Sequence, residues 1–115
     1  MSSEREALRL HDIIDNIDRI FMYLDGVEAD EFGDDQKTVD AVERCLQRVT
    51  EAVIKVGEER MREIAPTLPV HAVRGLGNVL RQEYDGINYE MVWETVTNRL
   101  PVLRADCAKA LSGGG

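Results

Sequence analysis

Four polar side chains between residues 74 and 85 suggest chemistry more directly than any others in this sequence. Arg74, Asn78, Arg81 and Asp85 follow one another at intervals of four, three and four residues, which places them on one face of a helix, with Gln82 at its edge. Two guanidinium groups and an amide could grip phosphate oxygens, because a guanidinium presents its donors in a fork that matches phosphate geometry. The alternative is an exposed face with local ion pairs, such as Arg81 with Asp85.

The length and composition indicate one globular domain. Of 115 residues, 43% are hydrophobic and 31% are charged, as is usual for such a domain. No apolar run approaches the ~20 residues of a membrane-spanning helix, and the polar start "MSSEREAL" lacks the apolar core of a secretory signal. We therefore expect a cytoplasmic protein without a membrane partner, with one domain over residues 1–111 and a disordered tail over residues 112–115.

The charge balance and the cysteines limit the kinds of partner. A formal net charge of −8 repels polyanions at long range, but a local basic patch can still bind them because charges beyond about 8 Å are screened. Cys45 and Cys107 lie far apart without metal-ligand spacing, so we expect two buried, reduced thiols. We expect no metal ion or other cofactor.

Apolar residues at helical spacing predict a first helix over residues 3–24. Ser3 and Glu6 form a capping pair at its start, and Gly26 is a stop signal. The apolar stripe consists of Leu10, Ile13, Ile17, Ile20 and Leu24. This pattern is typical of a helix that packs one face on a bundle and exposes the other.

An acidic segment over residues 25–35 separates this helix from the next. It contains six acidic residues and no basic ones. We interpret it as a solvated loop with Phe32 packed against the helices. The alternative is a docking surface for a basic partner.

A second helix is expected from Asp35 onwards. Six apolar residues recur at alternating spacings of three and four, and small side chains beside them would let another helix approach closely. The apolar residues are Val39, Val42, Leu46, Val49, Val53 and Val56, and the small ones are Ala41, Cys45 and Ala52. The pattern continues through Gly57 to Ile64, where the interior glycine predicts a bend or a close contact.

Two or three further helices complete the predicted fold. Pro69 suits the first turn of a third helix that closes at Gly86, and Asn88 is a good cap for a fourth. Pro101 is either a kink in this fourth helix or the first residue of a short fifth one ending near Leu111. The short connections favour an all-α, antiparallel up-down bundle of four to five helices. Because the apolar stripes are wider than a monomer must cover, we expect a homodimer.

Two stretches make the sequence resemble a known family. "GLGNVLRQEY" at residues 75–84 and "VWETVTNRLPVLR" at residues 92–104, with the isoleucine-rich and valine-rich helices before them, resemble the HepT-like branch of the HEPN proteins. The resemblance extends from about residue 8 to residue 111 and implies a dimeric helical bundle that cuts RNA without a metal. It also implies the toxin of a toxin–antitoxin pair, whose cognate antitoxin is a minimal nucleotidyltransferase.

The family motif is an arginine, a polar residue, three further residues, a histidine, one residue and a tyrosine. The resemblance places the arginine at Gly77, the polar residue at Asn78, the histidine at Gln82 and the tyrosine at Tyr84. The two missing side chains are those that would neutralise an oxyanion and exchange a proton. We therefore expect weak or no ribonuclease activity, with an active ribonuclease of rearranged site as another hypothesis.

Other roles stay open for the remaining polar residues. Arg74, Asn78 and Arg81 could be the phosphate contacts of a subunit that binds RNA or a nucleotide, or that packs against a nucleotidyltransferase partner. In some family pairs the antitoxin adenylylates the tyrosine that corresponds to Tyr84, while a buried ring is the alternative interpretation. We expect His11 to be packed or capping on the first helix.

Overall fold

The computed structural model describes residues 4–68 and 89–113, and each regular element within these ranges is helical. The elements, in chain order, are α1 (Glu4–Leu24), α2 (Ala29–Phe32), α3 (Gln36–Val56), α4 (Glu58–Ile64), α6 (Tyr89–Glu94), the π-helix η2 (Thr95–Arg99) and α7 (Leu100–Ser112). The predicted all-α class is therefore confirmed. The helix expected between Pro69 and Gly86 lies outside the described residues.

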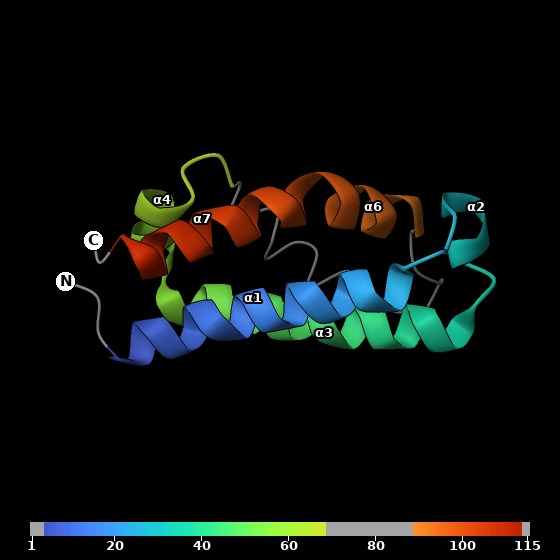
Figure 1. Cartoon of the computed structure of the whole chain (residues 1–115), viewed down its shortest axis with the longest axis horizontal. Helices are drawn as coiled ribbons and strands as arrows, with labels where there is room; N and C mark the ends of the chain where they lie inside the picture. The colour runs from blue at the N-terminus through green and yellow to red at the C-terminus, as the bar shows by residue number, and fades with distance from the viewer. Residues whose placement is uncertain (1–3, 69–88, 114–115) are drawn as a thin grey trace.

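Three long rods make up the described part of the bundle. α1 and α3 run antiparallel side by side, and α6, η2 and α7 form a third rod that packs on α1 and runs antiparallel to it (Figure 1). α4 lies at the end of the molecule where α1 begins, and α2 lies at the opposite end beside α6 (Figure 1). α1 is thus the helix shared by both long contacts.

The predicted apolar stripes of α1 and α3 form the centre of the core. All five stripe residues of α1 and five of the six on α3 are at most 9% exposed, while Val56 packs at the edge. Cys45 and Ala52 are 2% and 4% exposed. As the sequence predicted, these small side chains lie in the buried face of α3, where they let another helix approach closely. Each fully buried Val, Leu or Ile side chain stabilises the fold by roughly 1.5–3 kcal/mol relative to an exposed one.

The acidic segment between α1 and α3 is more structured than a loop. It contains the short helix α2, where the backbone amide of Glu28 donates to the Glu31 carboxylate at 3.1 Å. Phe32 is 1% exposed, as predicted, and its ring meets Tyr89 edge-on at 6.1 Å and Trp93 at 5.6 Å. A helix of four residues is too short to show a periodic apolar pattern, so the sequence did not predict it.

Gly57 breaks the helix that the sequence allowed to continue to Ile64. Its φ of +98° and ψ of 146° end α3 and start α4, with its amide still donating to Val53 and its carbonyl accepting from Met61. An added Cβ at Gly57 would meet no atom within 4 Å, so a side chain would not clash with its neighbours. Glycine is required because other residues rarely adopt this backbone conformation. The break redirects the chain so that α4 packs near the start of α1 (Figure 1).

Smaller predictions had mixed outcomes. Cys45 and Cys107 are buried and free, as expected. His11 is exposed rather than packed, because it lies on the side of α1 opposite the apolar stripe. Ser112, which was assigned to the disordered tail, is the last residue of α7. Among the described helices, none is long and apolar enough to cross a membrane.

Two forked ion pairs connect α1 to the elements around it. Arg60 on α4 donates to both carboxylate oxygens of Glu6 at 2.7 and 3.2 Å. Arg104 on α7 does the same with Asp18 at 2.6 and 3.1 Å. Because each pair joins residues far apart in the chain, the two pairs fix how α4 and α7 sit on α1.

Replacing Gly57 with alanine should destabilise the protein. A side chain is strained at this φ and ψ, so Gly57→Ala is expected to lower the free energy of unfolding by about 1–3 kcal/mol. Urea denaturation followed by circular dichroism measures the change. Glu59→Ala, at an exposed position two residues away, should stay within about 0.5 kcal/mol. Equal stability of Gly57→Ala and the unmodified protein would contradict the strain argument.

The pair between Asp18 and Arg104 predicts a pH-dependent contribution to stability. The hydrogen bonds from Arg104 hold the pKa of Asp18 below its ordinary value, so the pair stabilises the fold above the unfolded-state pKa and is lost as pH falls through the folded one. Both side chains are more than two-fifths exposed, so Asp18→Asn should cost only about 0.2–1 kcal/mol at pH 7. This difference should be smaller in acid, as the pH falls below the ordinary pKa of an aspartate and through the lower folded one, than at pH 7.

Urea titrations at both pH values provide the measurement, with Asp15→Asn, an exposed aspartate of the same helix, as the control. A difference between Asp18→Asn and the unmodified protein that persists unchanged in acid would show that the carboxylate charge is not its source.

Candidate functional site

The motif positions and the predicted phosphate contacts lie outside the described residues. These positions are Arg74, Gly77, Asn78, Arg81, Gln82 and Tyr84. The described chain stops before them at Leu68 and resumes after them at Tyr89. The candidate site is therefore built from the described residues near these two ends.

A wide helical turn in the third rod is the first irregular feature near the site. Leu100 donates its amide to Thr95, five residues back, and residues Thr95–Arg99 form the π-helix η2. Pro101 has no amide hydrogen to donate to the Thr97 carbonyl, which favours such a widened turn. The backbone at Arg99 and Leu100 is helical, so η2 runs directly into α7, and Pro101 follows an irregular turn inside one continuous rod rather than beginning a separate helix (Figure 1).

Two threonine hydroxyls supply further hydrogen bonds in this region. Thr95 donates to the carbonyl of Met91 and Thr97 to that of Trp93, each at 2.9 Å and four residues back. Hydroxyls that bond back in this way compete with the backbone ladder and bend helices. Single π-turns inside α-helices occur frequently at functional sites.

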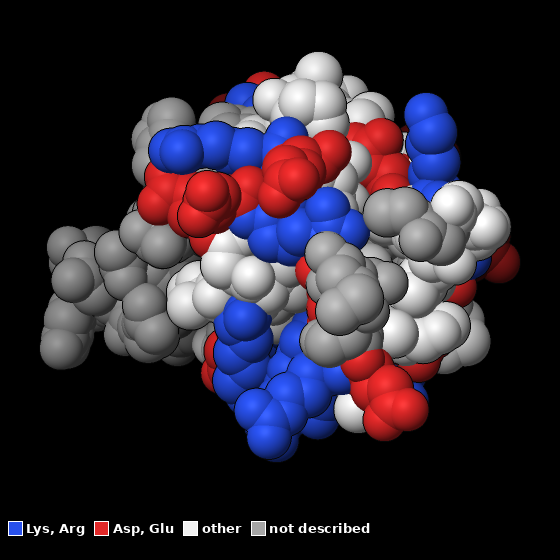
Figure 2. All heavy atoms as spheres, turned by 90° about the vertical axis from the view of Figure 1, so that its left-hand side faces the viewer, with Lys and Arg blue, Asp and Glu red and all other residues white. Residues whose placement is uncertain are grey.

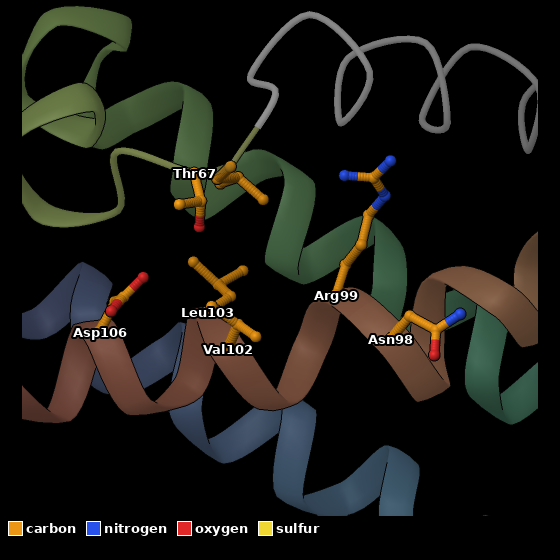
Figure 3. Close-up of a pocket in the computed structure, with 7 residues that line it drawn as sticks. Thr67, Asn98, Arg99, Val102, Leu103 and Asp106 are labelled. Carbon is orange, nitrogen blue, oxygen red and sulfur yellow. The ribbon is translucent and has the colours of Figure 1, made fainter.

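A hollow of about 100 Å³ lies beside this turn, between the rod and the chain that follows α4. Among the described residues, Leu103 is its buried floor, and Asn98, Arg99, Val102, Asp106, Thr67 and Leu68 line it. Figure 3 shows the Arg99 side chain rising from the rod on the side that faces Thr67. The wide turn therefore contributes both Arg99 and Asn98 to the lining of the hollow, with the Asn98 amide pointing away from the Arg99 guanidinium (Figure 3).

The chemistry available in this hollow is binding rather than proton transfer. Arg99 is exposed, makes no ion pair with a described residue, and presents a planar guanidinium with several N–H donors. Its forked donors suit an anion such as a phosphate group. Asp106, two turns along α7, is the carboxylate in the described lining, and no described histidine lines the hollow.

The sequence analysis missed Asn98 and Arg99 as candidates. They stand inside "VWETVTNRLPVLR", which was read for its resemblance and for the effect of its proline. The signal that could have identified them is the combination of two polar residues with a following proline, because a proline forces the preceding turn to rearrange.

The cysteines do not supply a nucleophile. Burial raises the pKa of the Cys107 thiol to about 12, with a further contribution from the Asp106 carboxylate. Burial also raises the pKa of Cys45, against the opposing charges of Arg48 and Arg19. Both thiols therefore stay protonated near neutral pH. Within residues 4–68 and 89–113, no group of three or more His, Cys, Asp or Glu side chains could hold a metal ion.

The described part of the chain is thus an all-helical bundle with a polar hollow beside its third rod. Residues 13–110 match the ribonuclease HepT-like family, and because this match covers most of the chain, the chain belongs to that family. The family resemblance drawn from the sequence is therefore confirmed.

Curated relatives from two organisms match most of this chain. "Putative RNase MJ0127" from Methanocaldococcus jannaschii is 36% identical over 92 residues, which cover 80% of this chain and 75% of the relative. "Putative RNase MJ1216" from the same organism is 31% identical over 102 residues, covering 89% and 84%. "Putative RNase TTE0752" from Caldanaerobacter subterraneus is 28% identical over 102 residues, covering 89% and 90%. No solved structure is significantly similar to this chain.

Proposed function

We propose that this chain is the HepT-like component of a toxin–antitoxin-type pair and that it is weak or inactive as a ribonuclease. The family match over residues 13–110 and relatives named as putative RNases support the HepT-like part, and the toxin–antitoxin role follows from the family resemblance. Gly77 and Gln82, at the positions where the resemblance places the motif arginine and histidine, support the second. The observation that carries the proposal is this loss of two side chains within an otherwise well-matched chain.

The chemistry of RNA cleavage explains why these two losses matter. A base must take the proton of the ribose 2′-hydroxyl, and a cation must neutralise the charge that develops on phosphorus. Glutamine does not titrate, and glycine has no side chain. Removing either kind of group typically lowers a rate by ~10²–10⁴-fold. Arg99 could supply positive charge, but the described histidine, His11, is exposed on α1 and does not line the hollow at Arg99.

The proposal includes three partners. A second copy of the chain would bury exposed apolar side chains of α1, where Leu8 and Met22 are 63% and 65% exposed. The second partner is a cognate minimal nucleotidyltransferase antitoxin, for which Tyr84 is the candidate adenylylation site. The third is RNA or a nucleotide.

The second candidate function is a binding subunit that holds RNA or a nucleotide without cutting it. The observation that favours it is Arg99 at the hollow, which makes no ion pair with a described residue and lies in a described lining that contains no histidine. Arg74, Asn78 and Arg81 would extend the phosphate contacts. Both candidate functions require that the protein binds RNA or a nucleotide. The second differs from the first because it involves no RNA cleavage.

Cleavage of total RNA and of tRNA tests the loss of activity. The purified protein should cut slowly or not at all, and Gly77→Arg/Gln82→His should increase the rate at least ~10²-fold by restoring both groups. Gly77→Lys/Gln82→Asn is the control, because it restores a charge but no titrating base. Rapid cleavage by the unmodified protein would overturn the proposed inactivity.

Binding measurements test the role of Arg99. Arg99→Ala should weaken RNA binding and reduce the slope of log affinity against log salt by about 0.7, as expected for one lost contact to single-stranded phosphate. Arg99→Lys, which keeps the charge but loses the fork, should give an intermediate affinity. Arg62→Ala is the control, because Arg62 is exposed on α4 and already paired with Glu58 at 2.7 Å. Unchanged binding by Arg99→Ala would remove the hollow from the RNA-binding surface.

A further inference from the structure

The hollow beside the third rod has a carboxylate at one end and a guanidinium at the other. Asp106 and Arg99 both line it and are seven residues apart on the rod, which corresponds to about 10 Å along its axis. Neither makes an ion pair with a described residue, and Lys109, one turn beyond Asp106, does not pair with it. The two opposite charges are therefore both available to a ligand that lies along the hollow.

The charges at the end of the molecule where α4 lies are mixed in sign. Figure 2 shows Lys and Arg side chains next to those of Asp and Glu on this face. On α4, Arg60 pairs with Glu6 and Arg62 with Glu58, each at 2.7 Å. Since paired charges largely cancel beyond the screening length of about 8 Å, the groups inside the hollow decide which ligand it binds.

The floor between the two charges of the hollow is apolar. Leu103 is 2% exposed and forms its base, Val102 is 49% exposed beside it, and Leu68 packs on the core from the chain after α4. A flat and largely apolar group gains free energy by covering such a floor, which favours a nucleobase over a sugar at this position. The volume of about 100 Å³ has room for several water molecules, and therefore for the edge of a base.

The polar groups at the Asp106 end select the kind of base. Figure 3 shows the side chains of Asp106 and Thr67 directed toward Leu103, one from the rod and one from the chain after α4. A carboxylate only accepts hydrogen bonds, and its two oxygens pair best with two neighbouring donors. Guanine carries two neighbouring N–H donors on its Watson–Crick edge, at N1 and N2, and its O6 beside them is an acceptor for a hydroxyl such as that of Thr67.

The other three RNA bases would place an acceptor against the carboxylate. Adenine and cytosine present one amino group next to an unprotonated ring nitrogen, and uracil presents one N–H between two carbonyls. An acceptor that faces a carboxylate is repelled and gives up its hydrogen bonds to water without a replacement, which is how a polar site rejects the wrong ligand. Asp106 therefore favours guanine.

We propose that the hollow binds a guanine base, which lies on Leu103 and Val102 and donates its N1–H and N2–H groups to Asp106. Thr67 donates to its O6, and Arg99 contacts the phosphate of the same nucleotide at the other end of the hollow. The binding of RNA or a nucleotide rests on the proposed function, while the choice of guanine rests on the hollow itself. Free guanine nucleotides and unpaired guanines in RNA share this chemistry.

Isothermal titration calorimetry with the four ribonucleoside 5′-monophosphates tests the choice of base for free nucleotides. GMP should bind at least about fivefold more tightly than AMP, CMP or UMP, which is the lower end of the discrimination that a bidentate contact to a base provides. A short single strand of RNA with a central guanine, compared with the same strand with adenine there, tests the choice in RNA. A preference in the nucleotides shows that the base and one phosphate suffice, and a preference in the strand alone identifies RNA as the source.

Asp106→Asn tests the carboxylate through a change of specificity that a merely structural role would not produce. An amide has one donor and one acceptor, a pair that each of the four bases can match. The variant should therefore bind the four nucleotides with similar affinity, by losing affinity for GMP and gaining affinity for the others. Asp15→Asn is the matched control, because it makes the same change at an exposed position of α1 outside the lining of the hollow, and it should keep the preference for GMP.

Arg99→Ala separates the phosphate contact from the recognition of the base. This variant should bind all four nucleotides more weakly and to a similar degree, while it keeps the preference for GMP. Guanosine, which has no phosphate, should bind Arg99→Ala and the unmodified protein equally well. A loss of the preference for GMP in this variant would contradict the assignment of the base to the Asp106 end.

The remaining outcomes distinguish this proposal from the proposed function. If the unmodified protein binds all four nucleotides equally and both strands equally, the choice of guanine is overturned and the binding function stands. If it prefers guanine but Asp106→Asn keeps the preference or weakens all four nucleotides alike, the assignment to the hollow is overturned. If neither the nucleotides nor the RNA bind, the guanine proposal and the binding subunit both fail, while the cleavage assay still decides the leading function.

Discussion

The packing of α1 against α3 determines most of what the described structure presents to its surroundings. Once the isoleucine stripe of α1 is buried, the directions of its other side chains follow from the helical repeat. The same register turns Glu6 toward α4 and Asp18 toward α7, where arginines meet them at 2.7 and 2.6 Å. It also sets Arg9 and Asn16 beside the basic residues of α3. The register of this single apolar contact thus decides which charged side chains of α1 meet partners on the neighbouring elements.

Two backbone irregularities do the remaining positioning. Gly57 stops α3 with a conformation that other residues avoid, which brings α4 back to the start of α1, where Arg60 meets Glu6. Pro101 withholds one amide hydrogen, and the wide turn before it presents Asn98 and Arg99 beside the hollow. Neither irregularity disrupts the core, because the residues on both sides of each keep their apolar side chains buried.

The sequence predicted the long helices well because burial imposes a repeat that can be read from residue types alone. The stripes of α1 and α3 and the burial of Phe32 follow from such patterns. Helix α2 was missed because four residues contain too little of the repeat, and His11 was misplaced by about half a helical turn. The hollow at Arg99 could not be predicted. Which charges stay unpaired depends on partners such as Arg60 and Arg104, which only tertiary packing selects. The motif residues lie outside the described ranges, so the catalytic, phosphate-binding and modification roles predicted for them stay predictions.

Binding and cleavage place different demands on this fold, which explains how one could survive without the other. Cleavage requires a base and a cation within hydrogen-bond reach of one phosphate and its neighbouring hydroxyl, so under the proposed function the two missing motif side chains would remove it. Binding adds up many separate contacts, and the chain carries other charged groups, such as Arg99, whatever stands at positions 77 and 82. A net charge of −8 provides no long-range attraction for a polyanion, so under the proposed function RNA would be held by close forked contacts. Such a bundle would retain a strand that a partner or a high local concentration has already brought to its surface.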